Sequence, residues 1–215
     1  MNKKVFFLLV FLAFFFSLEA QQFVATTPSN RKGVLEEFTG RTCSYCPQGH
    51  VIANNIQANY PDRFFTVNIH SDGYNSLNSY PNLNTAKGNQ IRAAFTAEYL
   101  PRGVVNRSTP SAVSRDVWAS YAEEQLEQTA ECNVGGKVMI DPETRVAAIE
   151  VEVYYTANSS VSENYLTIVM LQDSIIGSQT YAQENPAQWM GGSQYCHMHI
   201  LLLHVINMST RLVYV

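Results

Sequence analysis

The sequence reads Val34-Leu35-Glu36-Glu37-Phe38-Thr39-Gly40-Arg41-Thr42-Cys43-Ser44-Tyr45-Cys46-Pro47 where an apolar run meets a pair of cysteines. The run before the cysteines is typical of a buried strand, and apolar residues after Pro47 recur at helical spacing, at Ile52, Ile56 and Tyr60. A strand that leads into Cys-x-x-Cys at the start of a helix gives a low-pKa thiol beside a second, resolving thiol. The segment therefore predicts thiol–disulfide chemistry.

The position of each cysteine relative to the helix assigns its role. A helix beginning near Cys43 places that thiol beside unpaired backbone N–H groups, which stabilise the thiolate, and Arg41 adds a nearby positive charge. Cys46 lies one turn further along and can resolve a mixed disulfide. We therefore predict that Cys43 attacks and Cys46 resolves, a reaction that needs neither a cofactor nor a metal. Two alternatives stay open, an inert disulfide and a zinc site completed by His50, Cys196, His197 or His199.

The N-terminus has the pattern of an export signal. Lys3 and Lys4 give a basic start, residues 5–16 are uninterruptedly apolar, and small residues precede a cut site before Gln21. We expect residues 1–20 to be a signal peptide, with an uncleaved anchor as the alternative. The apolar run is too short to span a bilayer, and no later stretch is long enough, so we expect no transmembrane segment in the mature chain.

Charge and cysteine content exclude some classes of protein. The whole chain carries a net charge of −4, and loss of Lys3, Lys4 and Glu19 with the signal would change this to −5. Nonspecific nucleic-acid binding needs clustered basic residues, so we expect no nucleic-acid partner. The chain has four cysteines, too few for a domain held together mainly by disulfides, so a packed core must stabilise the fold.

Apolar periodicity divides the mature chain into two parts. In the first, helices are expected after Pro47, along Ile91, Phe95 and Tyr99, and over 114–128, with strands at 32–38, 64–70 and 103–105. From Cys132 to Gln172 the period is two, with a turn at 141–144. We expect a linker over 21–31, an α/β domain over 32–130, an incomplete β-rich module over 131–199, and an atypical tail over 200–215.

The Cys segment resembles the strand-to-helix segment of the thioredoxin superfamily. The resemblance implies that Glu37, six residues before Cys43, is the buried acid that assists proton transfer, although Glu36 is the alternative inward residue. It also implies that Pro101 of Leu100-Pro101-Arg102-Gly103-Val104-Val105 is the cis-proline facing the cysteines. The expected fold is thus an α/β thioredoxin-like domain followed by a partial, immunoglobulin-like antiparallel β module. The dipeptide between the cysteines is Ser-Tyr, from which reductant and oxidant cannot be told apart.

A closer resemblance is to exported envelope proteins of Gram-negative bacteria named for a twenty-eight-kilodalton outer-membrane protein. It is carried by Glu37-Phe38-Thr39-Gly40 before Cys-x-x-Cys-Pro, by Val104-Val105-Asn106-Arg107, and by the stretch from Tyr195 to His199. This resemblance covers residues 32–199 and implies a periplasmic or outer-membrane-associated location.

These features are compatible with two functions. The first is an exported thiol–disulfide oxidoreductase whose partners are the thiols or disulfides of other envelope proteins, with catalytic residues Cys43, Cys46, Glu37 and Pro101. The second is an outer-membrane-associated binding or adhesion protein that uses the thioredoxin-like scaffold without catalysis. Tyr74 and Tyr80 in the loop 71–84 are the expected substrate-facing residues, and Cys132 and Cys196 are either paired or separate thiols.

Overall fold

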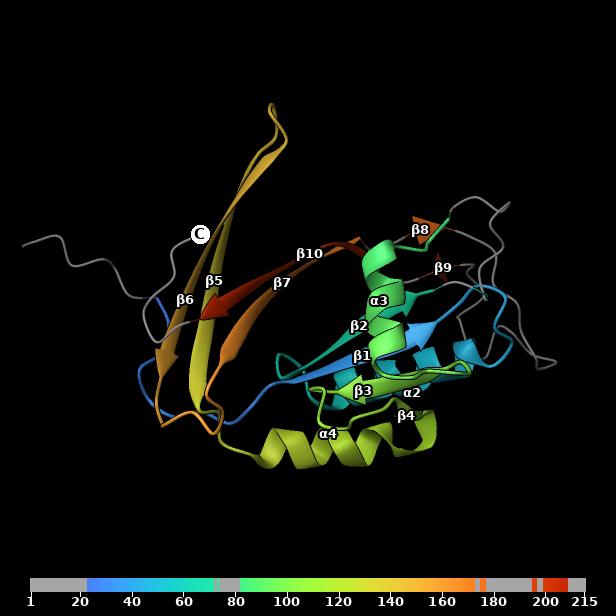
Figure 1. Cartoon of the computed structure of the whole chain (residues 1–215), viewed down its shortest axis with the longest axis horizontal. Coiled ribbons are helices and arrows are strands. Elements are labelled where there is room, and N and C mark those ends of the chain that lie inside the picture. The colour runs from blue at the N-terminus through green and yellow to red at the C-terminus, as the bar shows by residue number, and fades with distance from the viewer. Residues whose placement is uncertain are drawn as a thin grey trace, which may run out of the picture. The chain divides into compact units, whose positions relative to one another are not determined.

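The computed structural model describes residues 23–71, 73, 82–172, 175–176, 195–196 and 199–208. The expected signal peptide, Tyr74, Tyr80 and His197 lie outside these residues. The described chain forms two compact units, Ser29–Thr129 with Glu163–Ser209, and Ala130–Ser162 with residues 23–28. Each unit is described by itself below, and Figure 1 labels their elements.

A four-stranded sheet in the order β2-β1-β3-β4 organises the larger unit. Its strands are β1 (Gly33–Thr39), β2 (Phe64–His70), β3 (Arg102–Val105) and β4 (Val113–Ser114). The pair β1 and β2 is parallel, whereas β3 runs antiparallel to both β1 and β4. Because β1 lies between two neighbours and is covered on both faces, nearly all its residues are buried, which explains its unbroken apolar and acidic sequence.

Three helices cover this sheet, α2 (Cys46–Asn59), α3 (Ala86–Ala94) and α4 (Trp118–Glu127), the last preceded by a 3-10 turn, Arg115–Val117. Pro47 fits the first turn of α2, where its missing N–H is unneeded. Figure 1 shows α3 on one side of the sheet and α2 with α4 on the other. One core cluster therefore contains Phe38, Val67, Ile69, Val104 and Ile91, and the other contains Leu35, Phe64, Val105, Ile56 and Trp118.

The expected stripe of Ile91, Phe95 and Tyr99 is only partly correct. Ile91 is buried in α3, but the helix ends at Ala94, and Thr96 adopts a positive φ of 47° that turns the chain away. Tyr99 consequently lies beyond the helix with 60% of its surface exposed. Such a backbone angle is uncommon for a residue other than glycine, and the spacing of apolar residues does not predict it.

Several later strands belong to the same unit as the sheet. β7 (Asn164–Gln172) pairs antiparallel with β10 (His199–Met208), and β8 (Ile175–Ile176) pairs with β9 (Tyr195–Cys196). Val169 and Leu171 of β7 pack against the Phe38 cluster. This grouping differs from the single β-rich module expected over 131–199, because alternate apolar residues of β7 find their partners in the first core.

The second unit is a long hairpin of β5 (Cys132–Asp141) and β6 (Val146–Tyr155). Its turn forms where the sequence predicts, because Asp141 Oδ1 accepts hydrogen bonds from the backbone N–H groups of Glu143, at 2.8 Å, and Thr144, at 3.2 Å. The segment that begins at Phe23 lies along the hairpin, where Glu152 Oε2 accepts from the N–H groups of Phe23 and Val24. No further sheet strand joins β5 or β6 among the described residues, so the immunoglobulin-like arrangement stays a prediction.

None of the helices described here is long and apolar enough to cross a membrane.

Candidate functional site

The two cysteines of the motif form a disulfide, with 2.11 Å between the sulfur atoms and 5.4 Å between the Cα atoms. Helix α2 begins at Cys46 rather than near Cys43, and Cys43 lies in the preceding turn, where its carbonyl accepts from the Cys46 N–H at 3.3 Å. Cys46 is completely buried and Cys43 is 4% exposed. Both thiols are therefore buried in the disulfide form, and the order in which they act stays a prediction.

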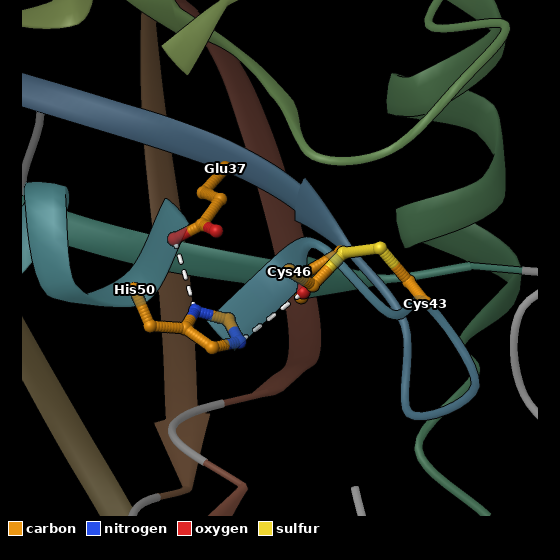
Figure 2. A network of polar contacts seen from close by, with 5 residues as sticks. Glu37, Cys43, Cys46 and His50 are labelled. Carbon is orange, nitrogen blue, oxygen red and sulfur yellow. Dashed lines mark hydrogen bonds and ion pairs between the residues drawn. A yellow bond between two sulfur atoms is a disulfide. The ribbon is translucent and has the colours of Figure 1, made fainter. Parts of the chain in front are cut away.

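Glu37 lies on β1 behind the disulfide and is completely buried. Its Oε2 is 3.2 Å from Nδ1 of His50, and Nε2 of His50 is 3.3 Å from Oγ1 of Thr39. Figure 2 shows the His50 ring between Glu37 and the cysteines. Within the part of the chain that the structure describes, Oε1 of Glu37 has no hydrogen-bond partner. A buried carboxylate with one unused oxygen is costly to maintain, which is typical of a functional site.

Pro101 packs against α2 and follows a cis peptide bond from Leu100, as the resemblance implies. Pro101 and Glu37 both lie close to Gly49 of α2. A Cβ atom added at Gly49 would lie 3.0 Å from Pro101 Cβ and 2.7 Å from Glu37 Oε1. Pro101 and Glu37 therefore meet against the same turn of α2. Only a residue without a side chain fits between them.

Glu36, the alternative inward acid, is also buried but has a different partner. Its carboxylate receives two hydrogen bonds from Arg107, at 2.6 and 2.7 Å. The side-chain hydrogen bond to Glu36 raises the pKa of the Arg107 guanidinium, as does the charge attraction between them, while burial opposes both. Glu36 is therefore the ion-pair partner of Arg107, whereas Glu37 contacts His50 on the helix that begins at Cys46.

The segment Val104-Val105-Asn106-Arg107 has a structural role that explains its composition. Asn106 and Arg107 both adopt left-handed backbone angles, with φ of 48° and 50°. The Asn106 side chain then accepts from Val34 N–H at 2.8 Å and donates to Lys32 C=O at 3.0 Å, so it caps the start of β1. The motif thus holds the end of β3 to β1.

Tyr45, between the two cysteines, faces outward. It is 55% exposed, and the guanidinium of Arg115 lies 5.8 Å from its ring centre. Arg115 is held by a 2.8 Å hydrogen bond from its Nε to Oε1 of Gln48 on α2. The surface next to the disulfide therefore carries an aromatic ring and a positive charge.

The zinc alternative finds no support among the described residues. No group of three histidine, cysteine or acidic side chains that could hold a metal occurs there. Both nitrogens of His50 already contact Glu37 and Thr39, and the two cysteines are joined to each other. The side chains of Cys196 and His199 and all of His197 lie outside the described part of the chain.

The sequence predicted Cys43, Cys46, Glu37 and Pro101 as site residues. It did not predict that Gly49 and His50 would contact Glu37. The available signal was spacing, since His50 falls one turn after Cys46 on the helix that carries it. A histidine at that spacing is also common in ordinary helices, so the sequence could not single it out.

No protein-family model matches the sequence, and no curated protein matches it. Two solved structures resemble the fold. HBP35 of Porphyromonas gingivalis superimposes with a TM-score of 0.60 at 14% identity, covering 86% of this chain and 62% of that one. A structural-genomics protein of Agrobacterium tumefaciens gives a TM-score of 0.50 at 12% identity, covering 84% of this chain and 79% of that one. The chain therefore spans 62% of the length of HBP35. Together with the sheet order, the Cys-x-x-Cys disulfide and the cis-proline, these likenesses show that the chain contains a thioredoxin-like domain.

Proposed function

We propose that this chain is an exported thiol–disulfide oxidoreductase of the cell envelope that acts through Cys43 and Cys46. The observation that carries the proposal is the convergence of a buried carboxylate, Glu37, and the ring of Pro101 on the helical turn after the disulfide. A disulfide whose only role is to hold a fold together needs neither group. The resemblance to the twenty-eight-kilodalton outer-membrane protein family supports an envelope location.

The reaction can be written in the reducing direction from the dithiol form. The Cys43 thiolate attacks one sulfur of a substrate disulfide, which forms a mixed disulfide and releases the other substrate sulfur as a thiolate. Cys46 then loses its proton and attacks Cys43 Sγ, which forms the Cys43–Cys46 disulfide and releases the second substrate thiolate. Two electrons pass from the cysteine pair to the substrate, whose thiolates take up the two protons. A dithiol donor must then reduce the pair again.

Insulin reduction by a dithiol donor tests this activity. We expect the chain to accelerate the reaction and the Cys43→Ser variant to lose the acceleration. We also expect the Cys43 thiolate to form well below the pKa of about 8.5 of a free cysteine. An ordinary Cys43 pKa combined with no acceleration over the donor alone would contradict the proposal.

Substrates can be identified by trapping. The Cys46→Ser variant keeps the attacking thiol but cannot resolve the mixed disulfide, so we expect it to retain envelope proteins covalently. The Cys43→Ser variant is the matched control, because its remaining motif thiol is completely buried in the structure. Separation of periplasm from outer membrane in the same cells tests the proposed location.

One observation favours the second candidate, an envelope-associated binding protein. Residues directly opposed in an antiparallel pair share a face, so the pairs Val134–Val153, Val138–Ile149 and Ile140–Ala147 place apolar side chains on one face of the β5–β6 hairpin. Val138 and Ile140 are 59% and 69% exposed. Completion of an immunoglobulin-like sandwich or a partner protein would cover this face. If Cys46→Ser captures nothing while Val138→Lys abolishes binding to envelope fractions, the binding function is favoured.

A further inference from the structure

We propose that His50 is a positioning residue for the second step of thiol–disulfide exchange. In this role it holds one carboxylate oxygen of Glu37, so that the other oxygen stays available to accept the proton of Cys46. The inference rests on the proposed function and assigns a task to a buried titratable group that the reaction scheme above does not use.

The geometry fixes one end of the carboxylate. His50 is 5% exposed and Glu37 is completely buried, so water does not compete strongly for the 3.2 Å contact between Nδ1 and Oε2. Rotation of the carboxylate would break this contact. Oε2 is therefore occupied, and Oε1 is the oxygen left for chemistry.

Oε1 lies against the first turn of α2, the helix that begins at Cys46. It points at the turn of α2 that follows Cys46, where Gly49 has no side chain to cover it and a Cβ atom would approach to 2.7 Å. Figure 2 shows this oxygen on the side of the carboxylate that faces the cysteines. No described group donates a hydrogen bond to it.

Thr39 orients the imidazole from the other side. If the Thr39 hydroxyl donates to Nε2 across 3.3 Å, the ring proton sits on Nδ1 and is donated to Glu37. In this arrangement Oε2 accepts from the ring, and Oε1 is the oxygen of Glu37 that can accept a proton. In the resolving step the Cys46 proton moves to Oε1, the Cys46 thiolate attacks Cys43 Sγ, and the proton later leaves with the substrate thiolate or the solvent.

Reaction of the reduced protein with an aromatic disulfide that releases a coloured thiolate separates the two steps. The first coloured equivalent reports attack by Cys43, and the second reports resolution by Cys46. All proteins compared carry Cys132→Ser and Cys196→Ser, so that only the motif cysteines react. A positioned general base contributes on the order of 100-fold or more, so we expect loss of its orientation in His50→Leu to slow the second phase by about tenfold, with the first phase unchanged.

Two amide variants make the test specific. Asparagine places its amide nitrogen near the position of Nδ1, so His50→Asn should restore most of the second-phase rate, whereas glutamine reaches toward the Nε2 position and His50→Gln should not. Thr66→Val is the control, because it removes a different buried polar group, on β2, and should change neither phase. Equal rates for His50→Asn and His50→Gln, or a second phase unaffected by His50→Leu, would overturn the inference.

The unmodified protein offers a test that depends on no variant. Nitrogen NMR of the histidine rings should show a proton on Nδ1 of His50, and a neutral ring protonated on Nε2 alone would overturn the inference. If the wild-type protein shows no exchange with any disulfide, the proposed function fails instead. A wild-type protein that exchanges, but with no dependence on His50, refutes only the role of His50.

Discussion

At the scale of single residues, the site depends on how little space lies between α2, β1 and the cis-proline. Glu37 and Pro101 both come within contact distance of the position where a side chain at Gly49 would begin. The side chain of Glu37 is therefore kept in place by packing as well as by His50. Because protein interiors have few voids, adding even one carbon atom at such a position must displace the neighbouring side chains.

Gly49→Ala tests this directly. Replacing an interior helical glycine by alanine usually stabilises a protein by about 0.5–1 kcal/mol. Here the added Cβ lies 2.7 Å from Glu37 Oε1, so we expect a loss of about 1–3 kcal/mol in the free energy of unfolding, as for overpacked cores, together with a slower resolving step. Denaturant unfolding measures the first effect. Gly136→Ala is the control, since its nearest neighbouring atom is 3.9 Å away, and equal behaviour of the two variants would contradict the argument.

At the scale of elements, polar side chains rather than apolar ones join the ends of the strands. Glu36 on β1 and Arg107 after β3 form an ion pair with two hydrogen bonds, while Asn106 caps the start of β1 through two more. Asp141 has a similar role at the end of β5. These contacts fix where strands begin and end, which apolar packing alone does not.

We expect Arg107→Met to lower the free energy of unfolding by about 2–3 kcal/mol, because it leaves the buried carboxylate of Glu36 without its donor. Arg107→Lys should lose part of this amount, since an ammonium group cannot make both parallel contacts. The double variant Glu36→Gln with Arg107→Met removes the unpaired charge and should recover stability relative to Arg107→Met alone. Denaturant unfolding measures all three variants. A double variant as unstable as the sum of its single changes would show that the two residues are not coupled.

The hairpin turn predicts a pH dependence with a definite sign. Hydrogen bonds from the Thr144 side chain and backbone, and from the Glu143 backbone, lower the pKa of Asp141. The folded state therefore favours the carboxylate, so its contribution to hairpin stability is present above the unfolded pKa of about 3.9 and is lost as pH falls through the lower folded pKa. NMR titration of the Asp141 carboxylate should give a midpoint below that of an unfolded aspartate. Thr144→Ala should raise the midpoint, and an unchanged midpoint would contradict this explanation.

At the scale of the whole molecule, strand β7, which follows the hairpin in sequence, belongs to the core of the larger unit. β7 sends Val169 and Leu171 into the cluster around Phe38, although more than 120 residues separate Leu171 from Phe38 in the sequence. The larger unit is thus completed only by the late strands. Long-range completion of this kind makes the folding of residues 32–130 depend on the C-terminal part of the chain.

Two neighbouring residues of β7, one packed on the core and one exposed, test whether the strand stabilises the larger unit through its core contacts. Leu171→Ala should lower the free energy of unfolding of the larger unit by about 1–3 kcal/mol, because a partly buried leucine loses its core contacts. Met170, one position earlier, is 50% exposed, and Met170→Ala should cost less than about 0.5 kcal/mol. Denaturant unfolding followed through Trp118, which is buried in this unit, measures both. A similar loss for both variants would contradict the packing described here.

The sequence was most informative where structure is set locally. The strand before Cys43, the helix after Cys46 and the turn at Asp141 are confirmed, because each depends on periodicity or turn chemistry within a few residues. The outward turn at Thr96 and the return of β7 to the first core were missed, because one depends on an unusual backbone angle and the other on distant contacts. Glu37 and Pro101 were placed through resemblance, whereas His50 required coordinates to show which group its ring meets.

A short run of exposed apolar residues on β5 also affects the solubility of the protein. Val138, Met139 and Ile140 are 59%, 67% and 69% exposed and follow one another along β5. Long apolar strands with accessible edges act as templates for further strands, and charged residues normally interrupt them. Concentrated or gently heated samples should therefore form β-rich aggregates that start at this hairpin. Met139→Lys would place a charge in the middle of this exposed apolar run and should slow aggregation.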